Sequence, residues 1–215
     1  MPRRRTIRLL IALVVVAVIS AAFELVIRPW YTDWGATPAE IAQPMPGDEL
    51  VAQPARAYTR AITIQAGTEQ VWPWVAQLGQ GKGGMYSYTG IEQAIGCDMH
   101  NADQIVPGWQ TVSAGDAVRM CQEGYGPPPY RVAAVEPGQA LILGHHPQGD
   151  DTTWSDSWTF VLSRIDAQTT RLFIRTRTTL SGLMWDVIDP GVFLMEYGML
   201  HGIKARAEAL AASGQ

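Results

Sequence analysis

The residues best suited to chemistry lie together in one short segment. Asp98, His100, Asn101 and Asp103 follow one another closely, beside Cys97. A carboxylate next to a histidine can orient the imidazole as a general base, and Glu92 provides a further carboxylate nearby in the chain. Three roles remain open: a catalytic site, a loop that Asn101 and Asp103 hold through backbone amides, and a polar rim that orients a ligand.

A metal site is a weaker interpretation of the same segment. Asp98, His100 and Asp103 would converge on one ion only if the loop curled, and no second histidine follows at the spacing of one helical turn. The stretch HHPQGDD at 145–151 has two histidines, but neighbouring residues of a strand point to opposite faces. We therefore expect a solvated hairpin end there, and we predict neither a metal nor a cofactor.

The chain has only two cysteines, Cys97 and Cys121. An exported domain would permit a disulfide between them. With so little information in two cysteines, we favour a pair of buried free thiols and keep the disulfide as the alternative. A nucleophilic dyad of Cys97 with His100 is a further, less favoured interpretation.

The start of the chain predicts a membrane anchor. Residues 7–27 form an apolar run that is long enough to cross a hydrocarbon core of about 30 Å as a helix. Arg3, Arg4, Arg5 and Arg8 precede the apolar residues that begin at Leu9, and Arg28 alone follows the run closely, which places the N-terminus in the cytoplasm and the rest outside. A cleaved signal peptide, with SAA at 20–22, and a buried helix are the alternatives.

Composition and organisation bound the remaining possibilities. The 215 residues carry a net charge of -4, and no basic run occurs after the first residues, so we expect no nucleic-acid partner. We divide the chain into a basic start and anchor (1–28), a linker rich in proline and alanine that we expect to be an extended tether (29–56), and one folded domain (57–215).

Periodicity in the folded part predicts a strand, two helices, a run of strands and a long C-terminal helix. Apolar alternation predicts strands over 57–66, 116–121, 130–137, 139–146, 154–166 and 169–180. Helical spacing predicts helices over 67–79, 89–96 and 189–213. The most economical arrangement is an α+β domain whose curved antiparallel sheet wraps around the C-terminal helix and leaves a cavity between them.

These elements resemble those of a known superfamily. The element order and the stretches TEQVWPWVAQLG, WSDSWTFVL and TRLFIRTR are similar to the START-like (SRPBCC) superfamily, which includes polyketide cyclases and lipid-transfer domains. YSY at 86–88, Glu92, the DMHNAD segment at 98–103 and Pro107 resemble a bacterial group within it. The resemblance spans about residues 57–212 and implies a helix-grip fold with a hydrophobic cavity. It implies no reaction, because members bind, carry, cyclise or hydrolyse.

We therefore expect membrane-tethered binding of a hydrophobic or amphipathic small molecule, lipid-like or polyketide-like, rather than catalysis. The candidate ligand-binding residues lie on the polar segment, on one strand face and on the terminal helix: Tyr86, Tyr88, Glu92, Asp98, His100, Trp154, Trp158, Phe160, Met195 and Met199. A cyclase or hydrolase using Glu92, Asp98 and His100 is the rival. An accessory subunit of a membrane complex, held through residues 7–27, is the third possibility. Arg175 and Arg177 are expected to face solvent.

Overall fold

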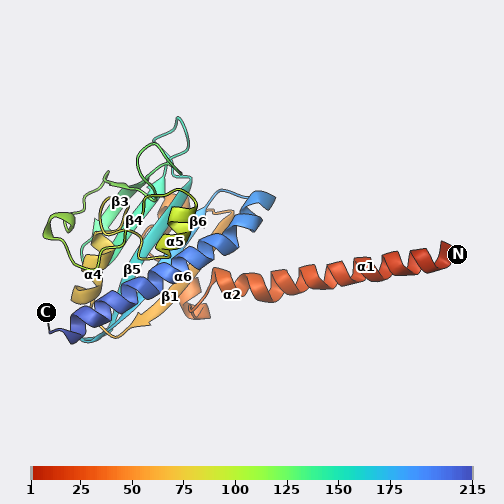
Figure 1. Cartoon of the computed structure of the whole chain (residues 1–215), viewed down its shortest axis with the longest axis horizontal. Coiled ribbons are helices and arrows are strands. Elements are labelled where there is room, and N and C mark those ends of the chain that lie inside the picture. Colours follow the sequence, from red (N-terminus) through yellow and green to blue (C-terminus); the bar gives the residue numbers. More distant parts are fainter. Residues whose placement is uncertain (1, 215) are drawn as a thin grey trace.

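The computed structural model describes residues 2–214, with the side chains of residues 7, 8 and 10–214. The side chains of Arg3, Arg4 and Arg5, on which the predicted orientation of the N-terminus rests, lie outside the described residues. The folded part is a sheet gripping one long helix, and a second long helix leaves it on one side (Figure 1).

The sheet has six antiparallel strands in the order β1-β6-β5-β4-β3-β2. This arrangement confirms the predicted α+β class and the helix-grip architecture. The strand predicted at 116–121 is reduced to two residues, and the other strands lie close to their predicted positions. Their bounds are β1 Arg56–Ile64, β2 Ala117–Val118, β3 Tyr130–Glu136, β4 Ala140–His145, β5 Asp156–Asp166 and β6 Thr169–Thr178.

The helices of the domain cover one face of this sheet, which we call the concave face. They are α4 Thr68–Ala76, α5 Thr89–Ala94, a 3-10 turn at Pro107–Trp109, and α6 Leu183–Ala212. α6 begins earlier than its sequence pattern predicts, so Pro190 lies inside the helix rather than near its start. Phe160, Leu172, Leu200 and Ile203 are fully buried between the sheet and α6, which makes this layer the main core.

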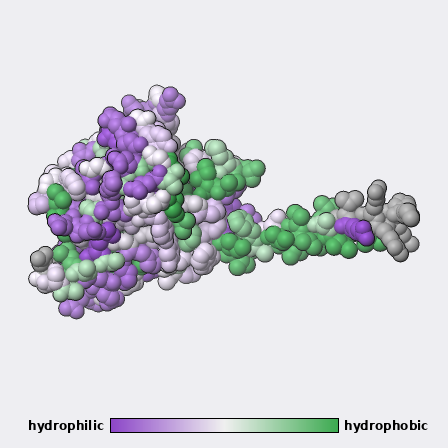
Figure 2. All heavy atoms as spheres, viewed as in Figure 1, coloured by the Kyte–Doolittle hydropathy of each residue, from purple (hydrophilic) through white to green (hydrophobic). Residues whose placement is uncertain are grey.

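The chain before the domain is helical. α1 Pro2–Ala22 continues through a π-helical turn, Phe23–Ile27, into α2 Arg28–Thr32. The helix projects away from the domain and presents apolar side chains on its surface (Figures 1 and 2). By length and composition the segment Leu10–Thr32 is able to cross a membrane, a test that a signal sequence also passes.

Residues 33–55, which we call the strap, lie on the convex face of the sheet. The strap contains the short helix α3 Pro38–Ala42 and the 3-10 turn Asp48–Val51. Met45 of the strap is buried with Ala61 and Phe173 in a small second core. The extended tether predicted for residues 29–56 is therefore wrong, because this segment is packed against the sheet over much of its length.

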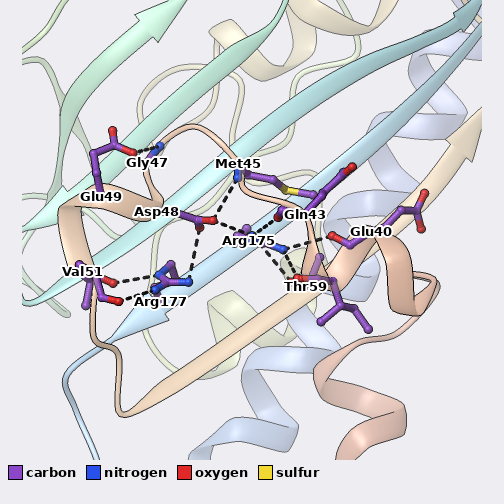
Figure 3. Close-up of polar contacts among 12 residues, drawn as sticks. Glu40, Gln43, Met45, Gly47, Asp48, Glu49, Val51, Thr59, Arg175 and Arg177 are labelled. Carbon is purple, nitrogen blue, oxygen red and sulfur yellow. Dashed lines mark hydrogen bonds and ion pairs between the residues drawn. The ribbon is translucent and has the colours of Figure 1, made fainter.

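Arginines of β6 hold the strap in place (Figure 3). The Arg175 guanidinium donates to the Gln43, Glu40 and Ile41 carbonyls at 2.9, 3.2 and 2.7 Å, and it pairs with Asp48 at 2.8 Å. Arg177 donates to the Val51 and Ala52 carbonyls. The predicted solvent exposure of Arg175 is wrong, because its side chain is 6% exposed. The strap provides the acceptors that water would otherwise provide.

Cys97 and Cys121 form a disulfide, with their Cα atoms 4.8 Å apart. The favoured prediction of two free thiols is therefore wrong and its alternative is correct. The bridge joins the loop after α5 to the segment after β2. Sequence spacing alone does not reveal this proximity, because 24 positions separate the two cysteines.

Candidate functional site

A polar patch on the concave face starts on β1. Successive side chains of a strand alternate between its faces, so Arg56, Tyr58 and Arg60 share the concave face with Ile62 and Ile64. The two isoleucines belong to the apolar core, whereas the first half of the strand presents charge to the same layer. The concave face thus changes from apolar to polar toward the end of β1 that follows the strap.

Carboxylates of α6 meet this end of β1. Arg56 pairs with Asp186 at 2.7 Å and with Asp189 at 2.6 Å, and the Tyr58 hydroxyl donates to Asp189 at 2.6 Å. Burial and this hydrogen bond raise the pKa of Tyr58 to about 12, so the phenol stays protonated. Arg60, fully buried, pairs with Glu196 and donates from Nε to the Tyr31 carbonyl at 2.9 Å.

Strand register extends the patch across the sheet. Tyr58 lies opposite Thr176, which lies opposite Trp158 on the next strand. In the neighbouring row of paired residues, Asp156 of β5 lies opposite His145 of β4. We define the polar patch as Arg56, Tyr58, Arg60, Tyr130, His145, Asp156, Trp158 and Thr176.

His145 lies at the rim of the patch between two hydrogen-bond acceptors. Its Nδ1 lies 3.2 Å from both Asp156 oxygens, and its Nε2 lies 2.9 Å from the Pro128 carbonyl. Both partners are acceptors, so the ring satisfies both only when both nitrogens carry protons. Burial, the largest single influence, lowers the pKa of His145, but the hydrogen bond and charge of Asp156 together with the Pro128 carbonyl outweigh it, and the net shift of the pKa is upward. With both nitrogens engaged, His145 is poorly placed to act as a base, and the predicted solvated hairpin end at this residue is wrong.

Aromatic rings form the floor of the patch. The Tyr130 ring lies 3.8 Å from the His145 ring and 5.2 Å from that of Trp158, between centroids. Trp158 in turn packs on Phe160 at 4.9 Å. Burial raises the pKa of the Tyr130 phenol. An apolar surface therefore continues directly from the polar groups of the patch.

Several polar atoms of the patch are buried without a hydrogen-bond partner. Among the described residues seven buried side-chain atoms are unpaired, and four of them belong to the patch: Arg56 Nε, Arg60 Nη2, Trp158 Nε1 and Thr176 Oγ1. Three of these four are N–H donors, and the hydroxyl can donate as well. Because native proteins pair most buried polar atoms, this concentration of hydrogen-bonding groups on one face makes the patch a candidate binding site.

Where a cavity was predicted between the sheet and α6, the described residues include the buried core side chains Phe160, Leu172, Leu200 and Ile203. Two open hollows lie at the surface of the described part of the chain. One of about 350 Å³ is lined by Arg28, Asp33, Arg56 and Tyr58, beside the patch. The other, of about 480 Å³, lies along α6 near Trp74 and Arg206. The first hollow reaches two members of the patch from outside.

Tyr86 and Tyr88, two predicted ligand residues, pack against α6. Tyr86 is buried, its hydroxyl accepts from Gln77 at 3.0 Å, and burial raises its pKa to about 12. A Cβ at Gly202 would lie 2.0 Å from the Tyr86 carbonyl oxygen, so α6 needs glycine there. Tyr88 lies against Gly198 and is 39% exposed. Both tyrosines therefore support the helix, and neither belongs to the polar patch.

The residues of the rival catalytic hypothesis are separated. Asp98 and His100 form a pair at 2.9 Å, but their side chains are 68% and 76% exposed. Glu92 is buried, one of its carboxylate oxygens is unpaired, and burial raises its pKa. No hydrogen bond joins Glu92 to Asp98 or His100 within residues 2–214. The pair lies in water, where a general base gains little from its surroundings.

Asn101 has the predicted loop-holding role, and Asp103 does not. The Asn101 side chain accepts from the Tyr86 amide at 2.7 Å and donates to the Ser87 carbonyl and the Thr89 hydroxyl. Asp103 contacts the guanidinium of Arg206 rather than a backbone amide, and its side chain is 85% exposed. The 97–103 loop is thus pinned by Asn101 and by the disulfide.

The other predicted ligand residues divide between the core and the convex face. Trp158, Phe160 and Met199 are buried in one core cluster, and the Met195 carbonyl accepts from Ser87. Trp154 is different: it precedes β5, stacks on His146 at 3.8 Å and covers Gly144 on the convex face. The prediction that Trp154 shares a face with Trp158 is wrong, because the strand period does not extend before Asp156.

Sequence reasoning missed most of the polar patch. Arg56, Tyr58 and Arg60 carried a signal, since three polar residues alternate on the same side of a strand as Ile62 and Ile64. Thr176 gave no such signal in the sequence, because threonine is common in strands. Only the register brings it beside Tyr58 and Trp158.

Comparisons with known proteins found distant structural similarities only. No family model matches the chain, and no curated protein matches it. The chain is similar to a protein from Mesorhizobium loti (16% identity, TM-score 0.45, 72% of this chain and 98% of that one). It is also similar to a polyketide-cyclase-like protein from Corynebacterium glutamicum (14%, 0.41, 74% and 93%) and to an aromatase/cyclase from a Streptomyces species (14%, 0.38, 71% and 93%). At these identities the similarity concerns the fold alone.

Proposed function

We propose that the domain binds an amphipathic small molecule between the sheet and α6, with a hydrogen-bond-accepting group of the ligand at the polar patch. The observation that carries the proposal is the set of four buried, unpaired polar atoms on Arg56, Arg60, Trp158 and Thr176. An acceptor placed among them would recover the hydrogen bonds that burial has cost them. The apolar part of the ligand would lie along Trp158 and Phe160.

Ligand binding requires space between the sheet and α6, and the backbone hydrogen bonding of α6 is weakened at one point near its start. Pro190 has no N–H and cannot donate to the carbonyl one turn earlier, and Gly191 follows it. The turns before Pro190 are held by the contacts of Asp186 and Asp189 with β1. Release of these contacts would lift the start of α6 and open the space above the patch.

We further propose that the N-terminal helix tethers the domain to a membrane, with the N-terminus in the cytoplasm. The support is the exposed, apolar segment Leu10–Thr32 together with the excess of arginine before it in the sequence. Binding without turnover is favoured, because His145 has both nitrogens engaged and the Asp98–His100 pair is exposed.

Native mass spectrometry of the full chain, purified in detergent, tests ligand binding. We expect wild type to retain a small molecule and Trp158→Phe to lose most of it, since phenylalanine keeps the ring but lacks the N–H. Trp74→Phe is the matched control, because Trp74 Nε1 is also buried and unpaired but lies outside the patch. Equal retention by Trp158→Phe and wild type would refute the site, and a wild type with no bound molecule would refute binding.

A further inference from the structure

The first turns of α6 present apolar side chains to the outside. Leu183, Met184 and Val187 are 79%, 66% and 73% exposed, and Ile188 is 39% exposed. We call these four residues the α6 apolar surface. On the other side of the same turns, Asp186 and Asp189 pair with Arg56. This part of α6 is therefore amphipathic with its apolar side turned away from the domain, an arrangement that marks an interaction surface.

Contacts fix this surface relative to the N-terminal helix. Arg28 lies 3.5 Å from Asp186, and the Trp30 ring packs edge-on against Phe193 with centroids 5.3 Å apart. α6 begins on the side of the domain from which the N-terminal helix departs (Figure 1), and an apolar region of the surface lies there (Figure 2). The start of α6 and the end of the N-terminal helix therefore lie on the same side of the domain and are exposed to the same environment.

The neighbouring part of the N-terminal helix is also apolar and exposed. Leu25, Val26 and Trp30 are 77%, 66% and 60% exposed. Leu25 and Val26 belong to the run that is able to cross a membrane, and tryptophan is typical of the membrane–water interface. The α6 apolar surface thus adjoins the exposed apolar part of the N-terminal helix, which we expect to be in contact with lipid.

We propose that the α6 apolar surface lies in the interfacial layer of the same bilayer that the N-terminal helix crosses. The inference rests on the proposed membrane tether and goes beyond it, because a tethered domain need not touch the bilayer. Pairing with Arg28 and Arg56 keeps Asp186 and Asp189 on the domain side, so only apolar side chains enter the lipid. The polar patch would then open at the headgroup level, and an amphipathic ligand would reach it directly from the membrane.

Fluorescence quenching by spin-labelled lipid tests the contact. The full chain is reconstituted in vesicles of phosphatidylcholine and phosphatidylglycerol, with a single added cysteine carrying an environment-sensitive dye. The native cysteines are oxidised to a disulfide and do not react with the dye. The test position is Val187→Cys. Val16→Cys reports the tether, and Ile165→Cys is the matched exposed apolar control, near the end of β5 and 57% exposed.

We expect lipid spin labels to quench the dye at 187 and at 16 strongly and the dye at 165 weakly, with blue-shifted emission at the first two positions. Quenching at 16 without quenching at 187 would overturn the contact and leave the tether standing. A dye at 187 that is blue-shifted but not quenched would also overturn it, in favour of a protein covering the surface, such as a second copy of this chain. Absence of quenching at 16 would overturn the tether itself.

Discussion

The two faces of the sheet both bury arginines, but only one face pairs them fully. On the convex face every guanidinium nitrogen of Arg175 has an acceptor from the strap or from Thr59. On the concave face the side chains of Arg56 and Arg60 are 8% and 1% exposed, yet each leaves one nitrogen without a partner among the described residues. Buried donors with a full set of acceptors hold a structure together, whereas unpaired donors cost stability unless something else uses them.

We infer that the convex face is structural and that the concave patch is prepared for a ligand. The strap belongs to the same chain and always supplies its carbonyls. The start of α6 supplies the carboxylates of Asp186 and Asp189 and the Gly182 carbonyl to Arg56 and Tyr58. Within the described part of the chain, Trp158 Nε1 and Thr176 Oγ1 have no hydrogen-bond partner. The comparison yields three predictions on stability, given from the largest effect to the smallest.

Replacing Arg175 by methionine should have the largest effect. The change leaves Asp48 and three strap carbonyls without their donor, and we expect the free energy of unfolding to fall by about 3 kcal/mol. Chemical denaturation of the purified protein measures the loss. Arg164→Met is the control, because its pair with Glu69 is more than half exposed and should contribute less than about 1 kcal/mol. Equal stability of Arg175→Met and wild type would show that the strap is not held in this way.

Two threonines of β6 sharpen the comparison within one strand. Thr176→Val removes an unpaired buried hydroxyl and should raise the free energy of unfolding by about 1 kcal/mol in the absence of ligand. Thr170→Val removes a hydroxyl that donates to the Ala66 carbonyl at 2.7 Å, and it should lower the same quantity by about 1–2 kcal/mol. Thermal and denaturant melts measure both. A loss in both variants would mean that the Thr176 hydroxyl has a structural partner.

His145 gives the smallest effect, which appears as a pH dependence. Its folded pKa is raised, so its protonated form stabilises the fold fully below the unfolded value of about 6.5. This stabilisation is lost as the pH rises through the folded pKa. Melts across that range should therefore show a downward slope with rising pH that Asp156→Asn reduces. A slope that persists unchanged in Asp156→Asn would show that another group causes it.

Much of the fold follows from local patterns. Alternation predicted β1, β3, β4, β5 and β6 close to their observed bounds, because side chains that share a face of a strand share one environment. Asn101 was also predicted to hold its loop, because asparagine side chains in loops bond to backbone groups. The partners themselves, at Tyr86, Ser87 and Thr89, lie 12 to 15 positions earlier in the chain and were not predicted. Composition misled for the strap, where proline and alanine indicated an extended tether and long-range contacts to β6 decided otherwise.

The sequence by itself determined the order of the elements, the two-residue period of the strands and the apolar N-terminal helix. These properties depend on neighbours within a few positions, where backbone geometry dictates which side chains share a face. Only the tertiary structure decided the Cys97–Cys121 disulfide, the pairing of Arg175 with the strap, and the gathering of Arg60, Trp158 and Thr176. Each of these joins residues far apart in the chain, and their proximity depends on sheet register and helix packing, which no local pattern contains.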